Sequence, residues 1–178
     1  MIGQKRLLML NASWHELPFI LAARKMGFYV ITTSTKAEYP GHRYADKYVP
    51  FDYSDYDGLV DLCKRIKIDA ISWGTTDPCA LAACYVGEKL GLKGHDTYEN
   101  GQIIHLKDRF KAFAKKYGIN TPIAEHFENV DDALDFESKA KYPVIVKPVD
   151  LAGGQGIKII RDKAFFAEAV KNAFHLSR

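Results

Sequence analysis

A short stretch near the end of the chain combines an apolar strand pattern, one lysine and a glycine loop. Residues 144–146 (Val-Ile-Val) predict a strand, and residues 156–160 predict its partner in a hairpin. Between them, residues 153–156 (Gly-Gly-Gln-Gly) permit positive φ angles and let backbone N–H groups approach phosphate oxygens. Lys147 places a cation inside the apolar run, where a buried ammonium needs an anionic partner. The hairpin is therefore a candidate phosphate site.

A structural interpretation of the same residues stays open. Lys147 would extend its ammonium into solvent at a sheet edge marked by Pro148, and the glycines would only form a loose turn. The loop is not a Walker A motif, because no Gly-Lys-Ser/Thr closes it and a strand follows instead of a helix.

Two polar loops in the first half of the chain follow predicted strands, at residues 11–16 and 74–78. In open parallel sheets, ligands bind beyond the carboxyl ends of the strands, so both loops are candidates for contacts with a substrate. Helix capping explains the same residues: Ser13 with Glu16 forms a capping box, and Thr76 or Asp77 before a proline is a good N-cap. Capping and ligand binding are compatible, since a helix N-terminus also attracts anions.

The elements that carry these loops alternate between strand and helix, which predicts an α/β fold with a parallel sheet covered on both faces. The expected strands are residues 6–10, 28–32, 47–51 and 69–73, and the expected helices are residues 17–26, 57–66 and 80–90. After a polar connection at residues 94–101, we expect helices over 103–117, 129–139 and 163–174 and a short strand over 123–127. No G-x-G-x-x-G fingerprint follows the first strand, which disfavours a dinucleotide or sugar-nucleotide binder.

Composition excludes several other classes of protein. A net charge of +3 in 178 residues, with lysines and arginines spread along the chain, gives no case for nucleic acid. The three cysteines lack CxxC spacing, so we expect reduced, packed thiols and neither a disulfide framework nor a metal site. No apolar run approaches a membrane span and no cleavage-like site follows the N-terminus, which favours a cytoplasmic protein.

Four separated motifs together resemble the ATP-grasp ligases, in particular the group of biotin carboxylase, the carbamoyl-phosphate synthase large chain and the purine-ribonucleotide carboxylases. The motifs are Lys-Asp-Arg at 107–109, Tyr-Gly-Ile-Asn-Thr-Pro at 117–122, Tyr-Pro-Val-Ile-Val-Lys-Pro at 142–148 and the glycine loop. The resemblance implies a Rossmann-like pre-ATP-grasp domain over residues 1–94, followed over 95–178 by the small α+β lid subdomain of the ATP-grasp fold.

The resemblance also implies an ATP- and Mg²⁺-dependent ligase that activates a carboxylate or bicarbonate as an acylphosphate for attack by an amine. The residues implied to bind the nucleotide are Lys107, Lys147, Gly153, Gly154, Gln155 and Gly156. The positions implied for the acceptor substrate are Ser13, His15, Glu16 and Asp77. The metal ligands of such enzymes belong to a later, larger lobe.

The chain stops at Arg178, before that lobe, so we expect this chain alone to be inactive and to be the N-terminal part of a longer ligase. The alternative is a non-catalytic nucleotide-binding or interaction module. Monomer and homodimer both stay open.

Overall fold

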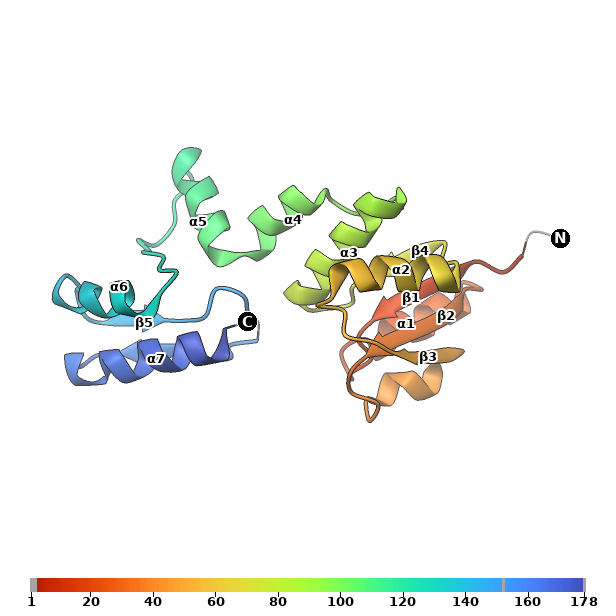
Figure 1. Ribbon diagram of the computed structural model, residues 1–178, viewed down its shortest axis with the longest axis horizontal. Helices are drawn as coiled ribbons and strands as arrows, with labels where there is room; N and C mark the ends of the chain where they lie inside the picture. Colours follow the sequence, from red (N-terminus) through yellow and green to blue (C-terminus); the bar gives the residue numbers. More distant parts are fainter. Residues whose placement is uncertain (1–2, 152, 178) are drawn as a thin grey trace. The chain divides into compact units, whose positions relative to one another are not determined.

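A computed structural model of the protein describes residues 3–151 and 153–177. Its contacts divide the chain into two compact units, Met1–Gln102 and Ile103–Arg178 (Figure 1). The two compact units divide eight residues after the boundary predicted between residues 94 and 95. A division by contacts does not test the domain assignment, so that boundary stays a prediction. Among the residues described, no helix has the length and apolar character needed to cross a bilayer.

A four-stranded parallel sheet forms the centre of the first unit. Its elements are β1 (Arg6–Leu10), α1 (Leu17–Lys25), β2 (Tyr29–Ser34), the 3₁₀ helix η1 (Pro40–Tyr44), β3 (Lys47–Pro50), α2 (Tyr56–Ile66), β4 (Ala70–Ser72) and α3 (Asp77–Leu90). The strands lie in the order β3-β2-β1-β4, and every pairing is parallel. The predicted α/β fold with a parallel sheet is confirmed.

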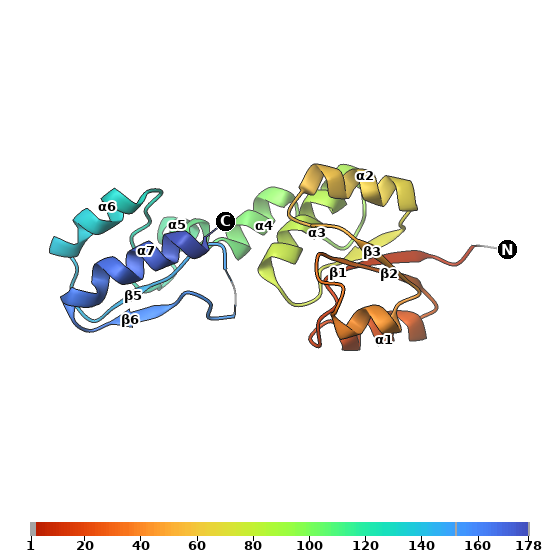
Figure 2. The same ribbon diagram turned by 60° about the horizontal axis from the view of Figure 1, so that its bottom comes forward.

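Helices cover both faces of this sheet, since side chains of successive strand residues point to opposite faces. Leu8 and Leu10 of β1 belong to the larger core, formed with α2 and α3, whereas Leu7 and Met9 belong to the smaller core under α1. Figure 2 shows α1 on one side of the sheet and the other two helices on the opposite side. The order of strands reverses between β1 and β4, so the carboxyl ends of these two strands form the topological switch point.

The helix α4 (Tyr98–His105) includes the residues at which the two units divide. It was not predicted, because the sequence indicates a polar connection at 94–101. Its Gly101 is buried, and an added Cβ there would lie 3.0 Å from the Cys84 sulfur. The single predicted helix over 103–117 is also wrong, because Leu106 adopts an extended conformation (φ −96°, ψ 122°) that separates α4 from the next helix.

The second unit packs helices against one face of a two-stranded antiparallel hairpin. Its elements are α5 (Lys107–Lys116), α6 (Val130–Asp135), the 3₁₀ helix η2 (Phe136–Ser138), β5 (Val144–Val146), β6 (Lys158–Ile160), the 3₁₀ helix η3 (Lys163–Phe165) and α7 (Phe166–Leu176). Its core joins Ala133 of α6, Ile160 of β6 and Val170 of α7. Figure 2 shows α6 and α7 on the same side of the hairpin.

Two predicted helix starts in this unit are confirmed by hydrogen bonds. Asn129 Oδ1 accepts from the Asp132 N–H at 2.9 Å at the start of α6, and Asp162 Oδ1 accepts from the Ala164 N–H at 2.9 Å. Asp162 begins the 3₁₀ helix η3, and the predicted helix over 163–174 becomes α-helical only at Phe166. The predicted hairpin is also confirmed, with strands of three residues each. The predicted strand over 123–127 is wrong, because that segment is irregular and leaves Ile123 98% exposed.

Candidate functional site

The glycine loop of the second unit is tied to the start of α5 by a lysine. Lys107 Nζ donates to the backbone oxygen of Val149 at 3.1 Å and to that of Leu151 at 2.5 Å. Both carbonyls belong to the segment that leads from β5 into the glycines, 42 and 44 residues further along the chain. The structure therefore brings Lys107 to the base of the glycine loop. Such proximity is needed if both are to contact the same phosphates, as the resemblance implies.

Lys147 lies directly after β5, two residues before the Val149 carbonyl that Lys107 contacts. Its side chain is exposed, and no partner for its ammonium occurs among the described residues. The expectation of a cation buried in an apolar run is wrong, since the strand ends at Val146 and the lysine extends into solvent. An exposed ammonium needs no anionic partner from the protein, so this position fits a lysine that simply extends into solvent. It fits equally well a lysine that contacts a ligand.

The glycines of the loop differ in how much room surrounds them. Gly153 (φ +65°) and Gly154 (φ +78°) are exposed, and no atom lies within 4 Å of an added Cβ. Gly156 (φ +70°) is enclosed, because a Cβ there would lie 2.7 Å from Pro148 Cγ. Gln155 lies between them with an exposed side chain. The tip of the loop is open to a ligand, while its base is packed.

The outer face of the hairpin is apolar and uncovered within the second unit. Ile145 of β5 pairs directly with Ile159 of β6, and their side chains are 61% and 59% exposed. Ile157 and Lys147 follow the same alternation and lie on this face, whereas Val144, Val146 and Ile160 face the core. An apolar surface thus ends at an unpaired cation and a glycine loop, which suits a ligand with a flat apolar part and an anionic part.

A buried carboxylate organises the carboxyl edge of the sheet in the first unit. Glu16 has no exposed surface, and its Oε2 accepts from the Ser13 N–H at 3.0 Å and from the Ser13 hydroxyl at 2.6 Å. Its Oε1 accepts from the Thr75 hydroxyl at 2.5 Å, 59 residues along the chain. Gly74 makes room for this side chain, since a Cβ there would lie 2.5 Å from Glu16 Cγ. One carboxylate therefore holds the loop after β1 against the loop after β4.

Three of the four residues implied for the acceptor substrate meet in this cluster. His15 is exposed, and its Nδ1 lies 3.3 Å from Ser13 Oγ. Glu16 is fully enclosed and occupied by neutral donors, so it positions its neighbours and does not face a substrate. Thr75 completes the cluster but was not predicted from the sequence, because no local pattern links two loops so far apart in the chain.

The capping interpretation of these residues holds only in part. The Ser13 N–H donates to the Glu16 side chain, as in a capping box. However, α1 begins only at Leu17, and its N-cap residue Glu16 makes no side-chain hydrogen bond to the first turn of the helix. At α3, Asp77 is the first helical residue, and the N-cap Thr76 makes no capping bond. The Thr76 hydroxyl is buried without a hydrogen-bond partner in the described part of the chain.

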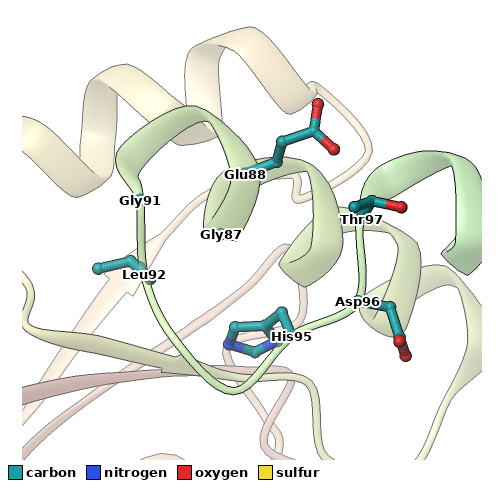
Figure 3. Close-up of a pocket in the computed structure, with 7 residues that line it drawn as sticks. All are labelled: Gly87, Glu88, Gly91, Leu92, His95, Asp96 and Thr97. Atoms are coloured by element: carbon teal, nitrogen blue, oxygen red, sulfur yellow. The ribbon is translucent and has the colours of Figure 1, made fainter.

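A small pocket lies at the other end of α3, between that helix and the segment leading into α4. It encloses about 220 Å³ and is lined by Gly87, Glu88, Gly91, Leu92, His95, Asp96 and Thr97. Figure 3 shows the carboxylates of Glu88 and Asp96 pointing away from one another. The His95 Nε2–H donates to the Ile71 carbonyl at 3.1 Å, and burial lowers the pKa of this imidazole. With its histidine engaged and a volume below that of ordinary ligand pockets, this pocket is a packing feature.

The described residues contain no cluster of three or more His, Cys, Asp or Glu side chains able to hold a metal ion. The three cysteines are free and buried, which confirms the prediction of reduced, packed thiols. Burial raises the pKa of the Cys63 thiol to about 12, so this thiol is not a nucleophile at neutral pH.

Comparison with known proteins finds one matching family model and a set of ligases. Residues 107–178 match the model described as "Carbamoyl-phosphate synthase L chain, ATP binding domain". The phosphoribosylamine–glycine ligase of Clostridium acetobutylicum is 29% identical over 114 residues, which are 64% of this chain and 27% of that protein.

Solved structures resemble nearly the whole chain. The phosphoribosylglycinamide synthetase of Anaerococcus prevotii has a TM-score of 0.64 and 26% identity, over 98% of this chain and 42% of that one. The biotin carboxylase domain dimer of the Hydrogenobacter thermophilus 2-oxoglutarate carboxylase, solved with MgADP, ADP and bicarbonate, has a TM-score of 0.71 and 22% identity, over 96% of this chain and 40% of that one. The chain thus spans well under half the length of the proteins it matches.

Proposed function

Because this chain belongs to the ATP-grasp superfamily, we propose that it supplies the phosphate-binding part of an ATP-dependent ligase that joins a carboxylate to an amine. The observation that carries the proposal is the Lys107 contact with the base of the glycine loop, beside the exposed Lys147. Two cations and an open loop then lie around one small region of the second unit.

The residues present fit the triphosphate of ATP. Gly153 and Gly154 leave space for backbone N–H groups to approach phosphate oxygens, and two ammonium groups offset part of the negative charge. In the structure, two backbone carbonyls accept from the Lys107 ammonium. We propose that phosphate oxygens replace these carbonyls and that the loop then moves over the nucleotide.

The outer face of the hairpin fits the base of the nucleotide. Ile145 and Ile159 present a flat apolar surface that ends at Lys147, so a purine ring packed there would place its phosphates toward the glycine loop. Bound ATP would supply a γ-phosphoryl group that activates the carboxylate as an acylphosphate. The role of Lys107 and Lys147 is to orient the phosphates and to balance charge during that transfer.

The other requirements of the reaction come from the resemblance. We propose that Mg²⁺ accompanies the nucleotide, and the described residues contain no cluster of His, Cys, Asp or Glu side chains that could hold it by themselves. The proposed carboxylate is a small organic acid or bicarbonate, the proposed compartment is the cytoplasm, and a homodimer is the proposed assembly.

The test compares three lysines of the second unit by their effect on ATP affinity, measured by calorimetric titration. Lys107→Met and Lys147→Met should each weaken ATP binding at least about tenfold, or about 1.4 kcal/mol. Lys158→Met is the matched control, because Lys158 is also exposed on the hairpin but lies on the opposite face to Lys147. Equal affinities for all three variants would refute the site assignment.

Catalysis is tested on the protein as its cell produces it. ADP formation that requires both a carboxylate and an amine would support the ligase. ATP binding that depends on Lys107 and Lys147 but leads to no ADP with any such pair would favour a non-catalytic nucleotide-binding module instead.

A further inference from the structure

A buried side-chain amide without a hydrogen-bond partner lies at the carboxyl end of β1. Asn11 is only 7% exposed, and its amide makes no hydrogen bond within the described part of the chain. Buried amides are nearly always hydrogen-bonded, because an unpaired one costs free energy. The amide is not sealed from solvent, since the fully enclosed unpartnered side-chain atoms of the described residues belong to Thr76 and Tyr142. Asn11 therefore offers its N–H donors to a group that arrives from solvent.

The backbone of Asn11 is held in place independently of this amide. Its φ angle is +70°, and its N–H donates to the Thr33 carbonyl at 2.9 Å, which extends the pairing of β1 with β2 by one residue. Asparagine tolerates this left-handed conformation better than most residues do. Glycine adopts it without strain and carries no amide. The conformation therefore accounts for the backbone and leaves the unpaired amide unexplained.

A lysine without an ion pair follows the neighbouring strand. Lys36 lies two residues after the end of β2, its side chain is exposed, and its ammonium pairs with no carboxylate of the described residues. Its backbone is fixed, because its N–H donates to the buried Ser34 Oγ at 3.0 Å and its carbonyl accepts from His42 Nε2 at 3.1 Å. The lysine thus extends from a turn whose backbone is already ordered.

The turn that carries Lys36 contacts the loop that begins at Asn11. Lys36 Nζ lies 5.5 Å from the centroid of the Tyr39 ring, and Tyr39 packs against the small core that includes Ala12. The Gly41 N–H donates to the Ala12 carbonyl at 2.8 Å, and a Cβ on Gly41 would lie 2.6 Å from that oxygen. The free ammonium and the free amide therefore belong to two segments in direct contact.

The charges of these two segments match a ligand with one negative charge. Lys36 is the single lysine or arginine within residues 11–16 and 34–39. An ammonium and an amide N–H both donate, and a carboxylate accepts from them in charge-assisted hydrogen bonds. Each segment also contains a glutamate, Glu16 or Glu38, so a second negative charge on the ligand would be repelled.

From these observations we infer that Asn11 and Lys36 bind the carboxylate of a small acid at the carboxyl edge of the parallel sheet. The Asn11 amide donates to one oxygen, and the Lys36 ammonium pairs with the other. β1 is one of the two strands that form the switch point, where open α/β sheets bind their ligands. Ser34 is a positioning residue, because it fixes the backbone of Lys36. The inference rests on the proposed function, since the bound acid is the carboxylate substrate of the proposed ligation.

The Asn11 amide itself reports binding by nuclear magnetic resonance. In the isotope-labelled 178-residue protein, its two N–H signals are the side-chain pair that Asn11→Gly removes. Titration with acetate or with bicarbonate should shift these signals saturably, and the tighter of the two identifies the acid as organic or inorganic. Methylammonium should leave them unchanged, and inorganic phosphate should bind more weakly than the better acid. No saturable shift with either acid, or tighter binding of phosphate, would overturn the inference.

Variants separate the amide from the backbone conformation. Asn11→Gly keeps the positive φ and removes the amide, so acetate affinity, measured by the backbone shifts of Ala12, should fall at least about tenfold while the free energy of unfolding does not fall. Lys36→Met should weaken binding by a similar factor. Lys25→Met is the matched control, because Lys25 is an exposed lysine at the opposite end of α1 from this loop.

The positioning role of Ser34 has its own test. Ser34→Ala should weaken acetate binding in the natural chain and should have no further effect in Lys36→Met, because Ser34 acts through the lysine. An equal loss in both backgrounds would show that Ser34 acts through the general stability of the edge.

Two outcomes distinguish this inference from the proposed function. Unchanged acetate affinity in both Asn11→Gly and Lys36→Met would assign the asparagine to its backbone conformation and would overturn the inference. ATP binding that depends on Lys107 and Lys147, without acetate or bicarbonate binding, would refute only this inference. ATP binding that ignores both of those lysines would refute the proposed function.

Discussion

The carboxyl edge of the parallel sheet and the glycine hairpin differ in how their polar groups are satisfied. At the sheet edge, Glu16 is fully buried and its carboxylate accepts from three donors of the protein. At the hairpin, Lys147 is exposed without a partner in the described chain, and Gly153 and Gly154 border open space. The first region is organised before a ligand binds, whereas the second offers groups that only a ligand would satisfy.

Packing explains this difference. The parallel sheet is covered on both faces, so loops at its edge are anchored by a continuous core on either side. The hairpin is covered on one face, and Ile145 and Ile159 remain exposed on the other. The proposed function assigns the choice of substrate to the rigid edge and the movement on nucleotide binding to the open hairpin.

Loss of the buried carboxylate should produce the largest change in stability. We expect Glu16→Ala to lower the free energy of unfolding of the first unit by about 3 kcal/mol, because the fully buried side chain would leave a cavity and its charge-assisted hydrogen bonds with Ser13 and Thr75 would be lost. Urea denaturation followed by tryptophan fluorescence measures this unit alone. Glu38→Ala, at an exposed carboxylate of the same unit, should change it by less than about 0.5 kcal/mol. Equal effects of the two substitutions would show that the cluster does not stabilise the edge.

The base of the glycine loop should be the part of the hairpin least tolerant of change. Gly156→Ala should destabilise the second unit by about 2 kcal/mol, since the new Cβ combines a positive φ with a clash against Pro148. Gly154→Ala, with the same backbone sign but open space, should cost about 1 kcal/mol. Scanning calorimetry of the two variants compares these costs, and the opposite order would contradict the enclosed position of Gly156.

Acid should destabilise the first unit through two histidines. Burial lowers the pKa of His42 and of His95 below 6.5, so the unfolded chain binds these protons first as the pH falls. Their stabilising effect is complete above pH 6.5 and is lost as the pH falls from there through the lowered pKa values of the folded state. Urea midpoints measured across this range should fall with pH, and His95→Gln should flatten the slope. An unchanged slope would assign the pH dependence to other groups.

Loss of the exposed cation should have the smallest effect on folding. Lys147→Met should change the stability of the second unit by less than about 0.5 kcal/mol, because its ammonium has no partner among the described residues. Calorimetry beside Gly156→Ala tests this. A large destabilisation would mean that the lysine is structural and that its loss cannot be used to measure ATP affinity.

Much of the fold could be predicted because local physics specifies it. The alternation of apolar strands with amphipathic helices predicted β1 over Arg6–Leu10, and the strand expected over 47–51 is found as β3. Asn129 caps α6 as expected, and Asp162 caps the 3₁₀ helix η3 that leads into α7, since a short polar side chain reaches the backbone N–H groups beside it. The break at Leu106 was missed because neither glycine nor proline marks it.

The candidate site likewise has features that local sequence predicts and features that only tertiary contacts decide. The sequence by itself identified the glycine loop, both lysines and the two polar loops, because residue type and spacing are local properties. Only the tertiary structure decided that Lys147 is exposed, that Lys107 contacts the carbonyls of Val149 and Leu151, and that Thr75 meets Glu16. Such contacts join residues 42 to 59 positions apart, and they exist because parallel crossovers and helix packing place distant loops side by side.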